Sequence, residues 1–285
     1  MSINVKEVLD KYLISDAEFE TIKEKSKISG EFSDDTFDDW FEKRFVNNLV
    51  SLTKDEYALM CVNALRILPG VSASDYGSSR QRDMGQLWAD MTRGYLGEMA
   101  FLKFLRTHWD IKSSLGHEKG NLADYLPMDI HEVSMPGETP RKPKINVSVK
   151  TTKWNGIWLD IPGDQFAHSD VHVLIKVGIG RDHLFAFFKE ISVFQDKVLK
   201  VGEEVGSLSK GESQTLYDSL PSFKEVPAYI CGFALKDAKY SALPYSGKKG
   251  RKNYTITGWN GPIAGGDLDE IKSVKGLAGR HPLRV

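Results

Sequence analysis

Three segments of this sequence carry residue types that could act together on a substrate. In the first segment, Glu98 lies three residues after Tyr95 and four before Leu102, so it falls on the apolar stripe of its own expected helix. A carboxylate that faces a core costs free energy unless it is paired, protonated or bound to a metal. The simplest alternative is a Glu at the edge of the stripe that pairs with Arg93 or Lys103.

The second segment offers two aspartates on an expected strand. Asp124 and Asp129 are five residues apart, so in an extended strand their side chains point to opposite faces and one of them can serve a site. Asp124 opens the segment before an apolar run, and we take it as the first choice, with Asp129 as its alternative. Either residue could instead be an ordinary aspartate of a turn or strand end.

The third segment, residues 145–152, alternates as a half-buried strand does. Ser148 and Lys150 are two residues apart and share one face, while Val147 and Val149 share the other. Taken alone, Lys150 would be read as a lysine on a solvent-facing strand.

Two carboxylates and an ammonium group together suit the hydrolysis of a phosphodiester. Acidic oxygens hold a hard cation such as Mg²⁺, which neutralises a phosphate and lowers the pKa of bound water. A nearby lysine stabilises the charge that develops on the phosphate during attack.

The order of these segments resembles the core of the PD-(D/E)xK nuclease superfamily. It consists of a helix bearing Glu98, a strand bearing Asp124 and a strand bearing Ser148-x-Lys150. The resemblance covers about residues 84–190 and is greatest to type II restriction endonucleases. It implies a Mg²⁺-dependent endonuclease of double-stranded DNA that acts as a homodimer, leaves 5′-phosphate ends and has a possible cognate DNA methyltransferase in the same system.

The resemblance also implies a role for each site residue. Asp124 would bind Mg²⁺ together with the Val149 carbonyl, Glu98 would bind it or hold a bound water, and Lys150 would orient or deprotonate the attacking water. The superfamily usually has an acid where this chain has Ser148, and serine is a poor metal ligand.

Four explanations of Ser148 remain open. Glu98 can supply the missing carboxylate, or Asp164, fourteen residues after Lys150, can do so in its place. One metal can be bound through Asp124 and the backbone alone, or the protein can be an inactive relative. Gln165, beside Asp164, is a weaker candidate for positioning the site.

Basic residues in three expected loops are candidates for contact with DNA phosphates. They are Arg80 and Arg82, Arg141 and Lys142, and Lys248, Lys249, Arg251 and Lys252. Each group has the alternative of being a solvated charged loop.

The pattern predicts an α/β (α+β) fold, in which helices flank a central mixed β-sheet with a restriction-endonuclease-like core. Residues 1–70 form an acidic, helical N-terminal region and residues 71–285 a nuclease domain. Helices are expected over residues 84–107 and 189–200. Strands are expected over residues 123–133, 145–152, 157–161, 171–177, 183–188 and 229–234. Pro69-Gly70 is expected to break the chain before a polar loop over 71–83, residues 134–144 to form a loop, and the tail from about 243 to be irregular.

Composition narrows the class of protein further. The 285 residues carry a net charge of −1, so positive charge for DNA must be local. Cys61 and Cys231 have neither disulfide nor zinc spacing, and we expect a cytoplasmic protein without a signal peptide or membrane span. P-loop, nucleophile-elbow and dinucleotide-binding motifs are missing from the sequence.

Two other functions fit the same residues. One is a phage, repair or junction nuclease of the same fold. The other is a DNA-binding protein that keeps the fold without catalysis, which Ser148 favours.

Overall fold

The computed structural model describes residues 3–75, 83–115, 129–143, 145–162, 169–191, 193–235 and 251–255. The helices are α1 (Val5–Lys11), α2 (Asp16–Ile28), α3 (Phe37–Trp40), α4 (Lys54–Asp75), α5 (Met84–Trp109), α7 (Arg181–Lys189), α8 (Lys200–Glu204) and α9 (Glu212–Ser219). Shorter helical segments are η1 (Asp34–Thr36), η2 (Phe41–Phe45), η3 (Val46–Asn48) and η5 (Phe194–Leu199). The strands are β1 (Leu49–Leu52), β2 (Lys112–Leu115), β3 (Ile130–Ser134), β4 (Val147–Thr152), β5 (Trp158–Pro162), β6 (Val171–Val177), β7 (Val226–Leu235) and β8 (Arg251–Thr255).

A four-stranded mixed sheet forms the centre of the molecule, as the sequence pattern predicts. Its order is β1-β7-β6-β4, with β4 parallel to β6 and the other neighbours antiparallel. Strand β6 is buried along its whole length, as expected of a strand covered on both faces. Two smaller antiparallel pairs, β2-β3 and β5-β8, accompany this sheet.

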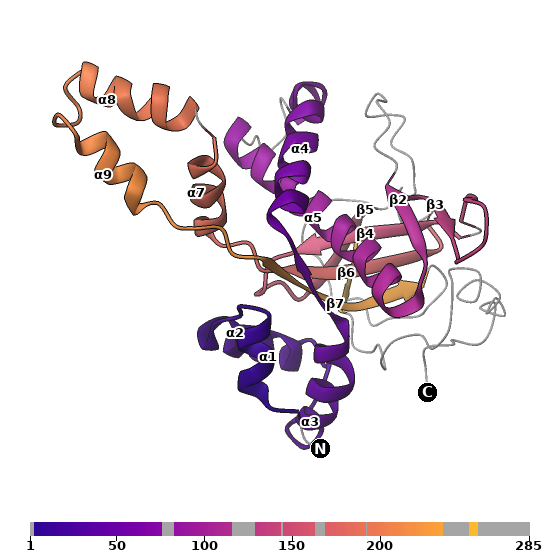
Figure 1. Ribbon diagram of the computed structural model, residues 1–285. Coiled ribbons are helices and arrows are strands. Elements are labelled where there is room, and N and C mark those ends of the chain that lie inside the picture. The colour runs from indigo at the N-terminus through magenta and orange to yellow at the C-terminus, as the bar shows by residue number, and fades with distance from the viewer. Residues whose placement is uncertain are drawn as a thin grey trace.

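Helix α5 covers one face of the sheet (Figure 1). Its buried side chains, including Leu96, Ala100 and Phe104, share a core with Val147 and Val149 of β4 and with alternate residues of β6. Spacing of three or four residues along α5 matches the period of a helix and places these side chains on one stripe. The face of β4 that carries Val147 and Val149 is therefore fixed against α5.

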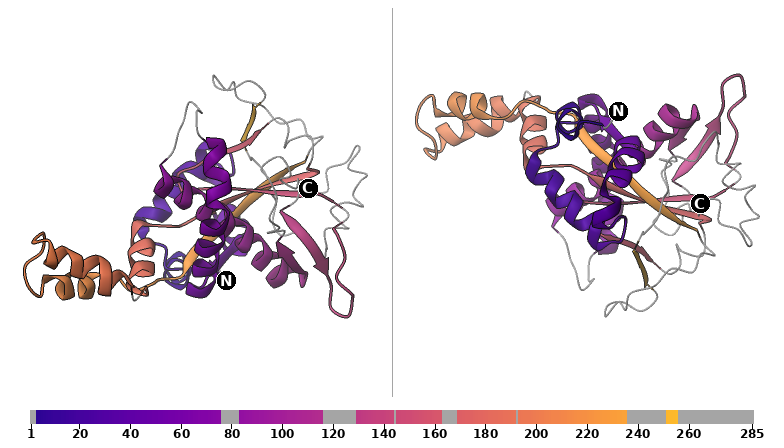
Figure 2. Two further views of the ribbon diagram at one scale, coloured as in Figure 1. Left: turned by 90° about the horizontal axis from the view of Figure 1, so that it is seen from above. Right: turned by 90° about the horizontal axis from the view of Figure 1, so that it is seen from below.

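The N-terminal helices α1–α3 cover the opposite face of the sheet (Figures 1 and 2). Phe41, Phe45 and Leu49 share a second core with Leu174 of β6 and Tyr229 of β7. Strand β1 continues from these helices and pairs with β7. Residues 3–52 thus contribute both a helical layer and one strand to the main sheet.

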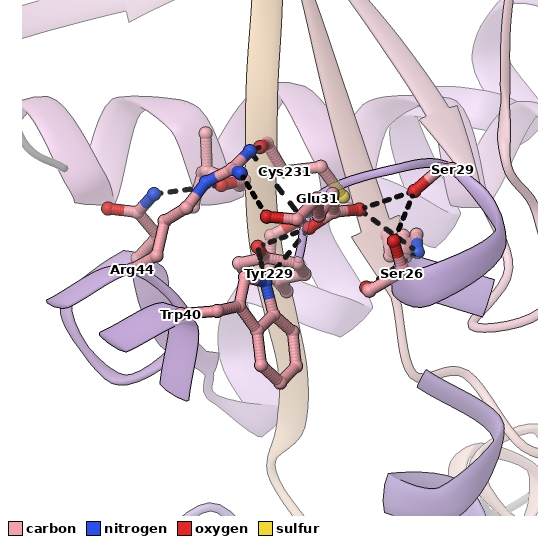
Figure 3. Close-up of polar contacts among 10 residues, drawn as sticks. Ser26, Ser29, Glu31, Trp40, Arg44, Tyr229 and Cys231 are labelled. Carbon is pink, nitrogen blue, oxygen red and sulfur yellow. Dashed lines mark hydrogen bonds and ion pairs between the residues drawn. The ribbon is translucent and has the colours of Figure 1, made fainter. Parts of the chain in front are cut away.

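A buried polar cluster joins this N-terminal layer to the sheet (Figure 3). The Glu31 carboxylate accepts hydrogen bonds from the Tyr229 hydroxyl at 2.7 Å and from the Trp40 indole N–H at 3.1 Å. The same carboxylate lies 3.7 Å from Nζ of Lys176 and 4.0 Å from a guanidinium nitrogen of Arg44. The side chains of Glu31, Lys176 and Arg44 are almost completely buried.

Two cations and one carboxylate in a buried cluster make it sensitive to the loss of any member. Arg44 also donates to the Cys231 carbonyl at 2.6 Å, which ties η2 to β7. Burial, followed by the charge of Glu31, raises the pKa of Tyr229 well above its usual value. Burial also raises the pKa of the Cys231 thiol to about 12, so this cysteine stays a protonated, inert core residue.

Several expected elements are confirmed and others are corrected. The expected helix over 84–107 is α5, and the strands over 145–152, 157–161, 171–177 and 229–234 are β4, β5, β6 and β7. Of the strand over 123–133, the structure describes β3 from Ile130 onward. The helix expected over 189–200 is shifted, since α7 ends at Lys189 and the next helical segments run from η5 through α8.

The strand expected over 183–188 is wrong, because these residues form α7. A short apolar run does not by itself distinguish a strand from a buried helix. The helix starts where the Nδ1 atom of His183 accepts the backbone N–H of Gly180 at 3.0 Å. Phe187 then packs edge-on against Tyr57 of α4.

The break expected at Pro69-Gly70 is also wrong, and so is the loop over residues 71–75. Helix α4 continues through Pro69 to Asp75. A proline removes one backbone donor from a helix interior and usually kinks or breaks the helix, but α4 does not end here. Residues 76–82 lie outside the described part of the chain.

Three strands were not predicted from the sequence pattern. Strand β1 lies inside the region expected to be helical, β2 lies between the expected helix over 84–107 and the expected strand over 123–133, and β8 lies inside the tail expected to be irregular. Each is formed by pairing with another strand, β1 with β7, β2 with β3 and β8 with β5, which a local pattern does not reveal. Among the described residues, no helix combines the length and apolar character needed to cross a bilayer.

Candidate active site

Strand β4 carries Ser148 and Lys150 on the face opposite to the one packed on α5. It pairs with β6 so that Ser148 lies beside His172 and Lys150 beside Leu174. Ser148 is buried and Lys150 is partly exposed. The side chains of β4 alternate between two faces as expected, but the strand is not half-buried: Val147, Ser148 and Val149 are all buried, and exposure begins at Lys150.

Asp129 lies along the other edge of β4. Its backbone N–H donates to the Val147 carbonyl at 2.9 Å, and its carboxylate accepts a short hydrogen bond from the Val149 N–H. These two bonds fix the Asp129 carboxylate beside the strand that carries Lys150. Because the N–H and C=O of one strand residue point to the same side, the Val149 carbonyl lies on this edge as well.

Helix α5 brings Glu98 to the same place through a close approach of its backbone to β4. At Gly97, a Cβ atom would lie 1.9 Å from Oγ1 of Thr151 and 2.9 Å from its Cβ. The Thr151 hydroxyl donates to the Gly94 carbonyl at 3.3 Å. Since Glu98 follows Gly97 and Lys150 precedes Thr151, this contact sets the position of Glu98 relative to Lys150.

The three side chains form one electrostatic unit. Loss of hydration, followed by repulsion from Asp129, raises the pKa of Glu98 well above its usual value, while Lys150 opposes the shift. Loss of hydration also raises the pKa of Asp129, and Lys150 and the Val149 N–H oppose that shift. Two carboxylates that repel each other beside an ammonium group are typical of a functional site.

The other partners considered for Glu98 are engaged elsewhere. Arg93 forms an ion pair with Asp90 at 3.1 Å. Lys103 forms an ion pair with Glu56 at 2.9 Å. The electrostatic neighbours of Glu98 are Asp129 and Lys150, which are far from it in sequence.

A divalent cation suits this donor set. Glu98 and Asp129 are two half-buried carboxylates whose mutual repulsion a cation would relieve. The Val149 carbonyl supplies a third oxygen on the same edge. Mg²⁺ is commonly held by one or two carboxylates and keeps several waters, so no larger cluster is required. Indeed, among the residues that the structure describes, no group of three or more His, Cys, Asp or Glu side chains is placed to bind a metal.

Part of the predicted site lies outside the described residues. This applies to Asp124, Asp164 and Gln165 and to the basic residues Arg80, Arg82, Lys248 and Lys249. The aspartate seen beside Glu98 and Lys150 is thus Asp129, the alternative of the sequence analysis. Its signal is its place directly before Ile130, the first residue of β3.

The remaining DNA-contact candidates lie on two described segments. Arg141 is half-buried, and its backbone exchanges hydrogen bonds of 3.0 and 2.8 Å with Val133 of β3. Lys142 follows it and is exposed on the loop that leads to β4. Arg251 and Lys252 open β8, which pairs with β5.

Comparison with protein-family models, with curated proteins and with solved structures found no match to this chain.

Proposed function

We propose that this protein is a Mg²⁺-dependent endonuclease that hydrolyses phosphodiester bonds of double-stranded DNA, in the manner of a type II restriction endonuclease. The observation that carries the proposal is the electrostatic unit of Glu98, Asp129 and Lys150 at the edge of β4. A helix carboxylate, an aspartate at a strand entry and a strand lysine are the groups that the PD-(D/E)xK resemblance requires.

Asp129, Glu98 and the Val149 carbonyl would hold the cation. The cation would neutralise a scissile phosphate and lower the pKa of water near it. Asp129 and Glu98 must both be ionised to bind it, and its charge favours that ionised form. The hydrogen bond from Val149 to Asp129 fixes one carboxylate before any ligand arrives.

Lys150 has two roles in this proposal. Its ammonium group limits the repulsion between the two carboxylates. It also places positive charge where the attacked phosphate becomes more negative, which stabilises the transition state. Ser148 lies on the same face of β4 as Lys150 and is buried, and in this proposal Glu98 provides the second carboxylate in its place.

Ser148 also favours a second candidate, a DNA-binding protein of this fold that does not cut. Its hydroxyl is a weak ligand for a hard cation compared with the acid that the superfamily usually has at this position. A protein of this kind would bind DNA without requiring Mg²⁺. Another nuclease of the same fold, acting in repair or on junctions, would differ in its substrate and keep the same site.

Plasmid digestion with and without Mg²⁺ tests these candidates. We compare wild type with Lys150→Ala, Asp129→Asn and Asp124→Asn, and use Lys153→Ala, an exposed lysine just past β4, as the matched control. Discrete fragments that require Mg²⁺ are expected from wild type and from the control. Loss of about 10²-fold or more in rate is expected for Lys150→Ala and Asp129→Asn.

Each outcome decides between named alternatives. If Asp124→Asn abolishes cutting and Asp129→Asn does not, Asp124 is the ligand and Asp129 is structural. A smear in place of fragments indicates a nuclease without sequence specificity. Absence of cutting on several DNAs, with Mn²⁺ as well, would support the binding protein.

A further inference from the structure

A helical arm, formed by residues 193–219, projects from the body of the molecule (Figures 1 and 2). It consists of η5 followed directly by α8, and of α9, which folds back against them. The structure describes all of these residues, and no side chain among them is buried. Helices this short are marginal in water without tertiary packing, so the arm lacks the burial that usually stabilises such elements.

The inner face of the arm is already occupied. Gly202 lies so close to Leu208 that a Cβ on it would meet that side chain at 2.8 Å. Gln195 donates to Gln214 of α9 at 2.8 Å. The Glu203 carboxylate accepts from the backbone N–H of Ser213 at 3.0 Å and from its hydroxyl at 2.6 Å. These contacts hold the two halves of the arm together.

A stripe of exposed valines lies on the flank of the same helical segment. Val198, Val201 and Val205 have relative exposures of 56%, 47% and 67%. Their spacing of three and four residues places them on one side of a helix. These three side chains present an apolar surface that a protein–protein contact would bury.

We propose that this valine stripe is the dimer interface, and that its partner is the same stripe of a second copy of this chain. The charges beside it are self-complementary. Lys197 and Glu204 are exposed, lie seven residues apart along the stripe, and form no ion pair with any residue that the structure describes. An antiparallel two-fold pairing centred near Val201 places Val198 of each copy against Val205 of the other, and brings Lys197 close to the partner copy's Glu204.

DNA is a poor alternative occupant for this arm. Residues 193–219 contain five acidic side chains (Asp196, Glu203, Glu204, Glu212, Asp218) and three basic ones (Lys197, Lys200, Lys210). A net negative element is repelled by a phosphate backbone. The use of the dimer rests on the proposed function, because cutting both strands requires one active site for each strand.

Sedimentation velocity of the full chain without DNA tests the interface. Wild type is expected to sediment as a dimer and Val201→Glu as a monomer. Val62→Glu is the matched control, since Val62 is 54% exposed on α4 of the body. Circular dichroism checks that both variants are folded.

A charge exchange makes the test independent of the valine. Lys197→Glu and Glu204→Lys are each expected to weaken the dimer about tenfold, and the double variant to restore it. A monomeric wild type, a dimeric Val201→Glu, or a double variant weaker than both single variants would overturn the proposed interface.

The nuclease assay separates this inference from the proposed function. A monomeric wild type that still cuts DNA with Mg²⁺ would overturn the interface and leave the function in place. A wild-type dimer that the interface substitutions dissociate, but that never cuts DNA, would support the interface and overturn the proposed nuclease function.

Discussion

Substitution of Gly97 by alanine is the sharpest available perturbation of the candidate site, because it changes a contact and not a functional group. The added Cβ would lie 1.9 Å from Oγ1 and 2.9 Å from Cβ of Thr151. Ordinary carbon contacts begin near 3.5 Å, so α5 and β4 must separate locally by roughly 1.5 Å or Thr151 must shift by a similar distance. Either change moves Glu98 relative to Lys150.

The expected magnitudes follow from this geometry. Overpacking of a tight contact costs about 1–3 kcal/mol of unfolding free energy. Displacement of a positioning group by about 1 Å can lower the rate about 10²-fold. Gly97→Ala is therefore expected to lose both stability and Mg²⁺-dependent cleavage, even though every proposed ligand is retained.

Gly94→Ala is the matched control on the same helix. A Cβ there meets nothing within 4 Å, so the substitution should gain the helix propensity of alanine, about 1 kcal/mol. Urea denaturation gives the free energy of unfolding of each variant, and plasmid digestion gives its rate. Thr151→Ala in the Gly97→Ala background removes the closest atom and should restore part of both losses.

One result would refute this reasoning. If Gly97→Ala is as stable and as active as Gly94→Ala, the approach of α5 to β4 does not set the site. Loss of stability with full activity would show that the contact supports the core alone.

Two further predictions concern charge. Glu31→Gln leaves Arg44 and Lys176 buried without their counter-charge, so urea denaturation should show that the free energy of unfolding falls by about 3–5 kcal/mol. The exposed control Glu24→Gln should change it by less than about 0.5 kcal/mol. An equally small effect of both substitutions would contradict the role of the buried cluster. The pKa of Glu98 is raised above the ordinary glutamate value of 4.5, so at pH values above 4.5 the folded, metal-free protein binds more protons than the unfolded chain. The free energy of unfolding should therefore fall as the pH rises above 4.5. Glu98→Gln should flatten this slope, and Mg²⁺ should raise the unfolding temperature more at higher pH; an unchanged slope in the variant would place Glu98 away from the site.

The sequence predicted much of what depends on local periodicity. The stripe of α5 and the alternation of β4 follow from spacings of 3.6 and two residues, and they place Glu98 on a helix and Lys150 on a strand. Composition and motif spacing also suggested the chemistry, since carboxylates and a lysine in this order suit a cation and a phosphate.

Local periodicity did not predict elements and contacts whose pairing partners are distant in the chain. Strand β1 exists because β7 pairs with it. The sequence predicts a strand where α7 forms, because a short apolar run fits the periods of both a helix and a strand. The buried Lys176 forms an ion pair with Glu31 of the N-terminal layer. The strand pattern around Lys176 does not predict this partner.

The choice between the two aspartates was also beyond the sequence. Period-two alternation predicted that Asp124 and Asp129 face opposite ways, and it did not say which way the site lies; Asp124 lies outside the described residues. Tertiary structure placed Asp129 at the edge of β4, through hydrogen bonds to Val147 and Val149, and brought Glu98 over the same edge through Gly97. The sequence by itself determined which residue types could do the chemistry. Among the described residues, tertiary structure brought Glu98, Asp129 and Lys150 together and raised the pKa of both carboxylates, because a pKa shift arises from neighbours in space and not along the chain.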